Sequence, residues 1–282
     1  MKTVGFIGCG NLSQAIIRGI LSRKLFLPSE IFASNRSPQK LEDFARETNI
    51  QKTKSNLEVA QNCKIVFVGT KPADFKQVVD DLSTIVAENH IIVSLAAGIK
   101  ISTLSKVFPK AGAIVRLMPN TACLINEGVI GFLSKANSNS QSVAQILEVK
   151  RIVEPLGIVI EVKTDSQIDG VLGASASGIG FVFRFIEEFC GWLESEGFDP
   201  QTSKKIAVQT FLGGSLQAHR QQDKTIQQLR ESVVSKKGTT EAGLKSMDAL
   251  NLSSVLRAGP EGAKIKSQEI GQDLEIQLLR DT

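Results

Sequence analysis

The stretch that decides the fold is Thr3-Val4-Gly5-Phe6-Ile7-Gly8-Cys9-Gly10-Asn11-Leu12-Ser13. Its first half has the β-branched and aromatic composition of a buried strand. Its second half matches the pattern G-x-G-x-x-G, with Ser13 in place of the third glycine. Gly8 suits a tight turn, Gly10 lets a pyrophosphate come close, and the helix entered through Asn11 and Leu12 offers free N–H groups to phosphates. The stretch predicts a strand, turn and helix that bind a dinucleotide, against the alternative of a tight turn without a ligand.

Short apolar strands alternate with helical patterns up to about residue 163, which is typical of βαβ units and a parallel sheet. The predicted strands are 3–8, 30–34, 64–69, 91–95, 113–117, 127–133 and 157–162, and the predicted helices between them are 12–22, 38–48, 73–86 and 140–153. Beyond this point the pattern is helical only, over 166–197, 200–219, 225–233, 239–250 and 252–279. We expect an α/β fold: an N-terminal Rossmann-like doubly wound sheet over residues 1–163, followed by an all-α C-terminal domain over residues 164–282.

The residues after the second strand bear on the choice of cofactor. A protein selective for NAD would place a carboxylate there to hold the ribose, and none is present. Instead Ser34, Asn35 and Arg36 offer hydroxyl, amide and guanidinium donors, which suit the 2′-phosphate of NADP. The sequence predicts NADPH as the cofactor, with NADH as a second candidate. A solvated loop arginine is the alternative interpretation of Arg36.

Two later strand ends reach the same edge of the sheet, where ligands of open α/β sheets bind. One is followed by Lys71-Pro72, in which Lys71 either contacts the cofactor or is an exposed loop lysine. The other is followed by Met118-Pro119-Asn120, in which Asn120 either caps the next short helix or faces the nicotinamide. The residue types do not decide between these roles.

Near the C-terminus, Ser235-Lys236-Lys237-Gly238-Thr239-Thr240 is a turn that leads into a helix. Free backbone N–H groups and the positive end of the helix dipole suit a small carboxylate at Gly238, Thr239 and Thr240. An ordinary N-cap by Thr239 would explain the same residues. The turn is therefore a candidate anion site with a purely structural alternative.

Composition excludes several kinds of chemistry. The 282 residues include two histidines, His90 and His219, and no tyrosine. These counts rule out a tyrosine as the catalytic acid and a metal site of three histidines, and we expect no metal. The 33 Lys and Arg are interspersed with 29 Asp and Glu, which argues against a nucleic-acid partner. The four cysteines lie far apart, and the charge-free apolar stretch 170–183 is shorter than a bilayer span. We expect a soluble, cytoplasmic protein without a membrane partner.

The terminal turn and several other segments carry a family resemblance. Residues 235–244 are similar to the signature S-P-G-G-T-T-x-x-G-L, and further similar segments occur in order at 6–12, 35–37, 71–72, 94–99, 116–121 and 209–210. On these residues the chain resembles the pyrroline-5-carboxylate reductase family. The resemblance implies reduction of 1-pyrroline-5-carboxylate to L-proline with NADPH or NADH, the last step of proline biosynthesis. It also implies a homodimer or larger homo-oligomer, in which the all-α domain binds substrate and dimerises.

Matching by position assigns roles to single residues. The resemblance implies that the backbone amides of Gly238 and Thr239 hold the substrate carboxylate, and that the Thr240 hydroxyl faces the ring nitrogen. Ser235 is implied to support the turn, so Thr240 and Ser235 are the candidate catalytic residues. The residues implied to line the nicotinamide side of the cofactor are Ala97, Met118, Pro119 and Asn120.

Two departures from the family pattern distinguish this chain. Lys236 and Lys237 replace the Pro-Gly of the signature, while Ile179 and Phe181 replace the Pro and Tyr of a similar S-G-S-G-P-A-Y pattern. Both bear on affinity or substrate choice more than on reaction class. Two alternative functions stay open: a non-catalytic NADPH-binding sensor that keeps the fold, and an NADP-dependent β-hydroxyacid-type dehydrogenase. The latter would need a base within 170–183, where no Lys, His, Asp or Glu stands.

Overall fold

The computed structural model describes residues 3–136 and 140–280. In these residues eight strands form one sheet in the order β3-β2-β1-β4-β5-β6-β7-β8. The strands are β1 (Val4–Ile7), β2 (Ile31–Ser34), β3 (Gln51–Lys52), β4 (Ile65–Val68), β5 (Ile91–Ser94), β6 (Ala113–Pro119), β7 (Gly128–Ala136) and β8 (Gly157–Glu161). All neighbouring strands pair in parallel except β6 and β7. The strand order reverses between β1 and β4, which is where doubly wound sheets bind ligands, at the carboxyl ends of the strands.

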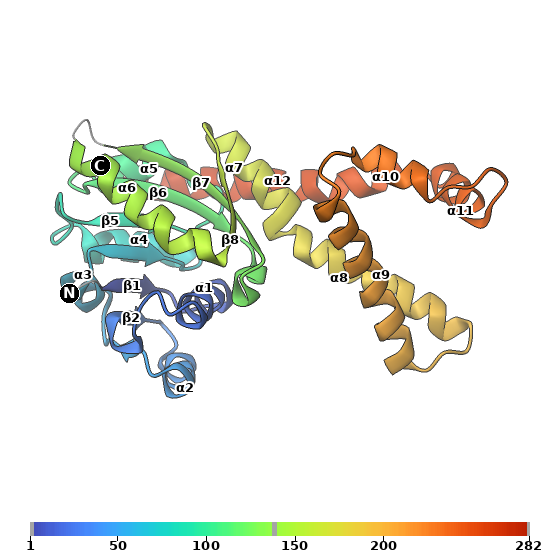
Figure 1. The fold of residues 1–282 in the computed structure, drawn as a ribbon. Coiled ribbons are helices and arrows are strands. Elements are labelled where there is room, and N and C mark those ends of the chain that lie inside the picture. Colours follow the sequence, from blue (N-terminus) through green and yellow to red (C-terminus); the bar gives the residue numbers. More distant parts are fainter. Residues whose placement is uncertain (1–2, 137–139, 281–282) are drawn as a thin grey trace. The chain divides into compact units, whose positions relative to one another are not determined.

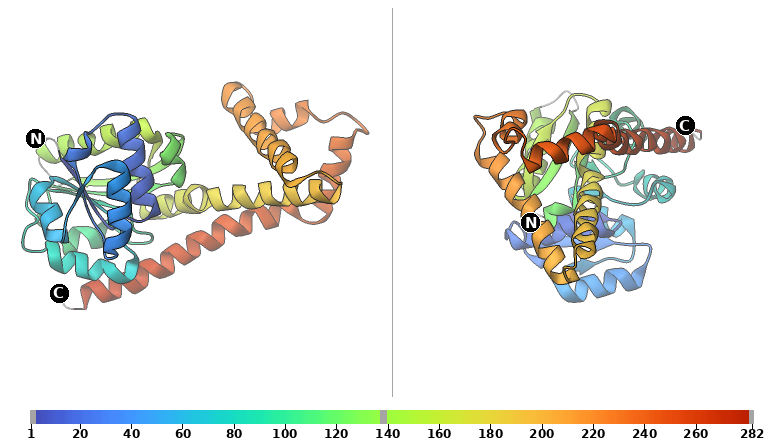
Figure 2. Two further views of the ribbon diagram at one scale, coloured as in Figure 1. Left: turned by 90° about the horizontal axis from the view of Figure 1, so that it is seen from below. Right: turned by 90° about the vertical axis from the view of Figure 1, so that its right-hand side faces the viewer.

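Helices cover both faces of the sheet (Figures 1 and 2). The helices of the chain are α1 (Asn11–Ser22), α2 (Pro38–Thr48), α3 (Asn56–Asn62), α4 (Pro72–Leu82), α5 (Ile101–Val107), α6 (Ser140–Val153), α7 (Asp165–Val171), α8 (Gly178–Ser195), α9 (Pro200–Arg220), α10 (Ile226–Ser232), α11 (Thr239–Ala249) and α12 (Leu252–Leu279). One core contains Ile16 of α1, Phe44 of α2 and Ile152 of α6. The other contains Phe75 of α4, Leu104 of α5 and Leu274 of α12. The fold class predicted from the sequence, a doubly wound sheet followed by helices, is confirmed.

Most predicted elements are present, and most of the differences are in short elements. Pro38 and Pro72 each open a helix, as their fixed φ and missing N–H favour. The sequence patterns missed α3 and α5, which have seven residues each and therefore show less than two full helical periods. They also missed β3, whose two residues are exposed and carry no apolar signal. Helix α4 ends at Leu82, four residues before the predicted end.

The chain forms two compact units: residues 1–179 with 260–282, here called the sheet unit, and residues 180–259, here called the helical unit. The predicted domains, 1–163 and 164–282, were divided where the sequence pattern changes from strands to helices. This division stays a prediction. Residues 164–179 belong to the sheet unit, to which apolar packing and ion pairs join them. Arg116 of β6 is almost fully buried and forms ion pairs with Asp165 at 2.5 Å and Asp169 at 2.8 Å, both on α7.

A stretch rich in small residues lies between α7 and α8. The sequence predicted one helix over 166–197, but the structure has a π-helical turn at Leu172–Ala176. A Cβ at Gly173 would lie 2.5 Å from the carbonyl oxygen of Pro260, a residue of α12 in the same unit. The small residue thus allows another backbone to come close, as its sequence context indicated.

The helical unit leaves many large apolar side chains exposed. Phe183 and Trp192 of α8 are 64% and 63% exposed, and Leu250 after α11 is 81% exposed. The rings of Phe189 and Phe211 pack edge to face at 5.2 Å and join α8 to α9. The helical run Asp165–Ser195, which begins in the sheet unit and continues into the helical unit, is long and apolar enough to cross a membrane by length and composition alone, whereas the stretch 170–183 is too short. The unit therefore carries apolar surface well beyond what its own packing covers.

Candidate functional site

The turn after β1 has the geometry of a phosphate-binding loop. Gly8 has a φ of +86°, and a Cβ there would lie 2.8 Å from the backbone of Gly69 and Thr70. Glycine alone satisfies both conditions. A Cβ at Gly10, by contrast, would meet nothing within 4 Å. The turn is thus packed tightly against the sheet and open in front of the first turn of α1.

Ser13 stands where the third glycine of the pattern would be, and it is buried. Its hydroxyl donates a hydrogen bond to the carbonyl oxygen of Gly8 at 2.7 Å, which stabilises the turn. Gly69, at the end of β4, supplies the close packing, because a Cβ there would collide with the Ser13 hydroxyl. The departure from the glycine pattern is compensated inside the site.

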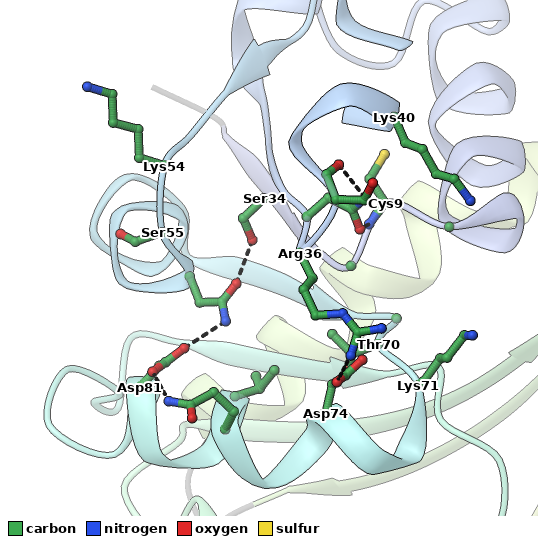
Figure 3. Close-up of a pocket in the computed structure, with 18 of the residues that line it drawn as sticks. Cys9, Ser34, Arg36, Lys40, Lys54, Ser55, Thr70, Lys71, Asp74 and Asp81 are labelled. Atoms are coloured by element: carbon green, nitrogen blue, oxygen red, sulfur yellow. Dashed lines mark hydrogen bonds and ion pairs between the residues drawn. The ribbon is translucent and has the colours of Figure 1, made fainter. Parts of the chain in front are cut away.

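Asn35 and Arg36 follow β2 and have different surroundings. The side-chain oxygen of Asn35 accepts a hydrogen bond from the backbone N–H of Cys9 at 3.2 Å, and its amide nitrogen donates to the carbonyl oxygen of Ser37 at 3.0 Å. Asn35 therefore ties the two loops together. The Arg36 guanidinium, mostly exposed, forms an ion pair with Asp74 in the first turn of α4 (Figure 3).

Ser34 begins a chain of hydrogen bonds along the side of the site. Its hydroxyl donates to the side-chain oxygen of Asn56 at 2.7 Å, and the amide nitrogen of Asn56 donates to a carboxylate oxygen of Asp81 at 2.7 Å (Figure 3). The other carboxylate oxygen of Asp81 accepts from Gln77 at 2.8 Å. Asn56 is the first residue of α3 and Asp81 lies near the end of α4, so three elements are connected.

These segments surround a cavity of about 790 Å³ at the carboxyl ends of β1, β2 and β4. Its charged lining residues are Arg36, Lys40, Lys54, Lys71, Asp74 and Asp81. The volume is within the range of small-molecule and cofactor sites. The side-chain oxygen of Thr70, in the cavity wall, is buried and has no hydrogen-bond partner within the described part of the chain. An open cradle at Gly10, an orphaned hydroxyl and an excess of cations fit a dinucleotide with its phosphates.

Cys9, in the middle of the turn, is among the residues that line the cavity, but it is buried and belongs to the apolar core. Burial raises its pKa to about 12, and the nearby Arg18 lowers the pKa only in part. The thiol therefore stays neutral at physiological pH and is not a nucleophile. Among residues 3–136 and 140–280, no group of three or more His, Cys, Asp or Glu side chains is placed to hold a metal ion.

The cavity brings together about half of the predicted cofactor residues. Those that line it are Gly8, Gly10, Asn11, Ser34, Asn35, Arg36 and Lys71. Those that do not line it are Leu12, Pro72, Ala97, Met118, Pro119 and Asn120. Leu12 packs against the core under α1, and Ala97 and Met118 belong to a small apolar cluster with Ile168. Contact of this second group with a cofactor stays a prediction.

Asn120 caps a short helix, which was one of its two predicted roles. Its side-chain oxygen accepts hydrogen bonds from the N–H groups of Ala122 at 3.2 Å and Val129 at 3.3 Å. Its amide nitrogen donates to the hydroxyl of Ser175 at 3.0 Å. The side chain is therefore fixed by three partners, and its contact with the nicotinamide is untested.

The terminal turn lies in the helical unit and starts α11. The N-cap is Gly238, not Thr239, and no side chain caps the helix, so the structural alternative of a Thr239 cap is wrong. The first N–H groups of a helix have no partner inside it, and here they include those of Thr239 and Thr240. A Cβ at Gly238 would collide with the hydroxyl of Ser235, which places Ser235 directly behind the turn. The turn keeps the uncapped donors that an anion site requires.

Lys237 adopts a left-handed conformation with a φ of +59°. In the family signature a glycine stands at this position, and glycine takes this conformation at no steric cost. The N–H of Lys237 donates to the carboxylate of Glu241 at 2.5 Å. That carboxylate also accepts a hydrogen bond from Lys245 at 2.9 Å. Both hydrogen bonds lower the pKa of Glu241, and the one from Lys245 has the larger effect. The turn therefore keeps a glycine-like backbone despite the substitution.

Several residues of the cavity were not singled out from the sequence. They are Lys40, Lys54, Asn56, Gln77, Asp74 and Asp81. Asp74, Gln77 and Asp81 share one face of α4 at a spacing of three and four residues, so the helix pattern alone could have grouped them. Nothing in the sequence showed that this face is opposite Ser34 and Arg36.

Comparisons with known proteins agree along the whole chain. A family model described as pyrroline-5-carboxylate reductase dimerisation matches residues 165–270, and one described as NADP oxidoreductase, coenzyme F420-dependent, matches residues 3–98. A curated relative, pyrroline-5-carboxylate reductase 3 of Danio rerio, is 32% identical over 95% of this chain and 91% of its own. Pyrroline-5-carboxylate reductase 2 of Bacillus subtilis is 28% identical over 98% of this chain and 99% of its own.

Solved structures show the same similarity. The crystal structure of Plasmodium falciparum pyrroline carboxylate reductase with NADP bound is similar with a TM-score of 0.85 and 27% identity, over 96% of this chain and 98% of that one. The structure of a pyrroline-5-carboxylate reductase from Coxiella burnetii gives a TM-score of 0.82 at 28% identity, over 95% and 98% of the two chains. Both matches include the sheet and the helices after it.

Proposed function

The chain belongs to the pyrroline-5-carboxylate reductase family, and from this premise we propose which of its residues reduce 1-pyrroline-5-carboxylate to L-proline. The sheet unit holds the nicotinamide cofactor, and the turn at Ser235–Thr240 holds the substrate. The observation that carries the proposal is the cavity at Gly8 and Gly10, with its cationic lining and the unpartnered hydroxyl of Thr70.

The cofactor half rests on the residues at the strand ends. The N–H groups at the start of α1 bind the pyrophosphate, and Gly10 lets it come close to the backbone. Arg36, Lys40 and Lys54 provide positive charge at the adenosine end. Ala97, Met118, Pro119 and Asn120 line the nicotinamide side, as their positions in the family pattern imply. When bound, the reduced nicotinamide supplies the hydride that the imine carbon accepts.

The substrate half rests on the uncapped start of α11. The backbone amide of Thr239 holds the carboxylate of the substrate, and the Thr240 hydroxyl is directed at the ring nitrogen. The N–H of Gly238, to which the resemblance gives the same role as that of Thr239, donates to the carbonyl oxygen of Ser235 at 2.9 Å. Since a cyclic imine accepts hydride readily once it is protonated, solution can supply that proton before binding. Thr240 then orients the ring by a hydrogen bond, and no strong acid is needed. This agrees with a chain that has two histidines and no tyrosine.

The exposed apolar side chains of the helical unit support assembly with further copies of the chain. They lie within the range matched by the dimerisation model, 165–270, and include Phe183 and Trp192. We assign the apolar character of the run Asp165–Ser195 to contact between subunits, with a homodimer as the smallest assembly. The cytoplasmic location expected from the unpaired cysteines stays a prediction.

The reaction itself is tested by adding pyrroline-5-carboxylate to the purified protein with NADPH or NADH and following nicotinamide absorbance. Consumption of reduced cofactor and formation of proline are expected. Tight cofactor binding without turnover would instead support the sensor alternative. The full-length relatives are named reductases, which favours the enzyme over the sensor and over a β-hydroxyacid-type dehydrogenase.

The role of Thr240 is tested by Thr240→Ala. Loss of one hydrogen bond to the substrate, worth about 1 to 2 kcal/mol, should lower kcat/KM about tenfold, while the Kd of NADPH stays unchanged. Thr239→Ala is the matched control, since it keeps the backbone amide assigned to the carboxylate and should leave kcat/KM within about twofold. Wild-type rates for Thr240→Ala would remove this hydroxyl from the mechanism.

The role of Arg36 is tested by Arg36→Asp. The substitution removes a cation and adds an anion where the 2′-phosphate is expected, so the Kd of NADPH should rise far more than that of NADH. Fluorescence titration of each reduced cofactor measures both constants. Equal losses for the two cofactors would mean that Arg36 does not contact the 2′-phosphate.

A further inference from the structure

The cavity contains two carboxylates from α4, although the end of β2 supplies none. The sequence has no carboxylate directly after β2, and its donors there were predicted to suit a 2′-phosphate. The fold brings Asp74 and Asp81 of α4 into the same cavity as Ser34 and Arg36 (Figure 3). The two carboxylates are seven residues apart, two helical turns, and so project from one face of α4.

Asp74 neutralises the group best suited to a phosphate. The Arg36 guanidinium, whose planar fork could bind a phosphate through two hydrogen bonds, is paired with the Asp74 carboxylate. Asp74 is the more buried partner, with its side chain 27% exposed against 76% for Arg36. Its place in the first turn of α4 further stabilises its negative charge. A 2′-phosphate would have to compete with Asp74 for Arg36 and would be repelled by it.

Asp81 adds a second negative charge, held by neutral groups. Its carboxylate accepts hydrogen bonds from the side-chain amides of Asn56 and Gln77. Amides fix the position of a carboxylate without cancelling its charge. The negative charge of Asp81 is therefore not offset by these two partners, and it acts on a ligand in the cavity.

The Asp81 carboxylate also sets the polarity of Ser34. Because a carboxylate only accepts, Asn56 turns its NH₂ group toward Asp81 and its oxygen toward Ser34. Ser34 must then donate its hydroxyl proton to Asn56, so it offers lone pairs to the cavity. Lone pairs suit the hydroxyl of an unphosphorylated ribose and do not suit a phosphate. This differs from the sequence-based expectation that Ser34 is a donor to the 2′-phosphate.

We propose that Asp74 and Asp81 are specificity-determining residues that offset the cations Arg36, Lys40 and Lys54, so that cofactors with and without a 2′-phosphate bind with similar affinity. The inference rests on the proposed function only in placing a dinucleotide in this cavity. It makes the choice of cofactor a balance between groups on α4 and groups after β2.

The test uses adenosine fragments of the cofactor, which carry no nicotinamide and cannot react. Isothermal titration of the full chain with 2′,5′-ADP and with 5′-AMP measures the contribution of the 2′-phosphate. For the wild-type chain we expect the two Kd values to lie within about tenfold of each other, a difference of about 1.4 kcal/mol. Asp74→Asn and Asp81→Asn should each tighten 2′,5′-ADP about fivefold to tenfold and leave 5′-AMP within about twofold.

Asp80→Asn is the matched control. It lies on the same helix and changes the net charge equally, but it faces a different cavity and pairs with Lys76 at 3.7 Å. Its ratio of Kd values should equal that of the wild type. Thermal unfolding of all variants checks that the isosteric substitutions keep the fold.

The outcomes separate this inference from the proposed function. A wild-type preference for 2′,5′-ADP above about a hundredfold overturns the inference, as do shifts for Asp74→Asn and Asp81→Asn no larger than for Asp80→Asn. If neither fragment binds, both the inference and the cofactor site fall. If the ratios shift as expected but pyrroline-5-carboxylate is not reduced, the inference stands and the proposed function falls.

Discussion

Glycines of the sheet unit that are packed against another segment contrast with glycines on the helices α8 and α9 of the helical unit. In the sheet unit a Cβ at Gly98 or Gly112 would collide with backbone atoms of another segment. In the helical unit a Cβ at Gly191, Gly213 or Gly214 would meet nothing within 4 Å. A glycine inside a helix costs up to about 1 kcal/mol relative to alanine, so this helical sequence is unfavourable for one chain alone. The glycines of α8 and α9 that meet nothing leave surfaces suited to close approach by a second copy.

The largest expected effect is in the sheet unit, at Gly98. Its φ is +75°, and a Cβ there would lie 2.6 Å from the backbone nitrogen of Gly271 in α12. Gly98→Ala combines backbone strain with a backbone collision that no rotamer relieves. We expect the free energy of unfolding to fall by more than about 3 kcal/mol in denaturant titrations.

Gly170→Ala is the control for this prediction. Gly170 is exposed on α7 in the same unit, and a Cβ there would meet nothing within 4 Å. The substitution should change the free energy of unfolding by less than about 1 kcal/mol, in the stabilising direction. Similar losses for both variants would mean that close packing does not distinguish the glycines of the sheet unit.

The next effect is in the helical unit, at Trp192. Its indole is largely exposed in the single chain, and we expect it to be buried by a second copy. Trp192→Glu should raise the dissociation constant of the oligomer at least about a hundredfold, since aromatic residues dominate such interfaces. Analytical ultracentrifugation measures this constant. Binding of NADPH should persist, because the cavity lies wholly in the sheet unit.

Arg184→Gln is the control on the same helix. Arg184 is exposed and forms ion pairs with Glu187 and Glu188, which contribute little because water screens them. The oligomer should stay intact in this variant. An unchanged oligomer with Trp192→Glu would show that the apolar surface of α8 serves another purpose.

The sequence could predict those features whose signals lie in neighbouring residues. Helix α2, at Pro38–Thr48, was predicted with correct bounds, and the predicted signal was the proline that opens it. In the structure its C-cap is Asn49, which adopts a left-handed conformation. The glycine turn of the cofactor site was predicted because its residues are adjacent in sequence. These signals are local, so the sequence alone carries them.

Features that depend on distant contacts were not predicted. Arg36 pairs with Asp74, and Ser34 is linked to Asp81 through Asn56, over 38 and 47 positions of the chain. No local pattern reports such pairs, since the order of the strands creates them. For this reason the glycine cradle was predicted, while the acidic side of the cavity was found only in the structure.

The smallest expected effect is at Lys237, where the helical unit departs from its family. Lys237→Gly relieves a left-handed lysine but increases the entropy of the unfolded chain, so the net gain should be only about 0.5 kcal/mol in thermal unfolding. The same substitution removes a positive charge beside the turn assigned to the substrate carboxylate. The KM for pyrroline-5-carboxylate should therefore rise about twofold to threefold at low salt, and less at high salt.

Lys237→Asn separates the two causes, because asparagine tolerates the left-handed conformation but carries no charge. If charge sets the KM, both variants should raise it equally at low salt. If backbone stiffness sets it, the glycine variant alone should change it, since only glycine loosens the turn. Unchanged KM values in both variants would mean that the lysine replaced the family glycine without contributing to substrate binding. The hydrogen bond from the backbone N–H of residue 237 to Glu241 would then be enough to keep the turn in place.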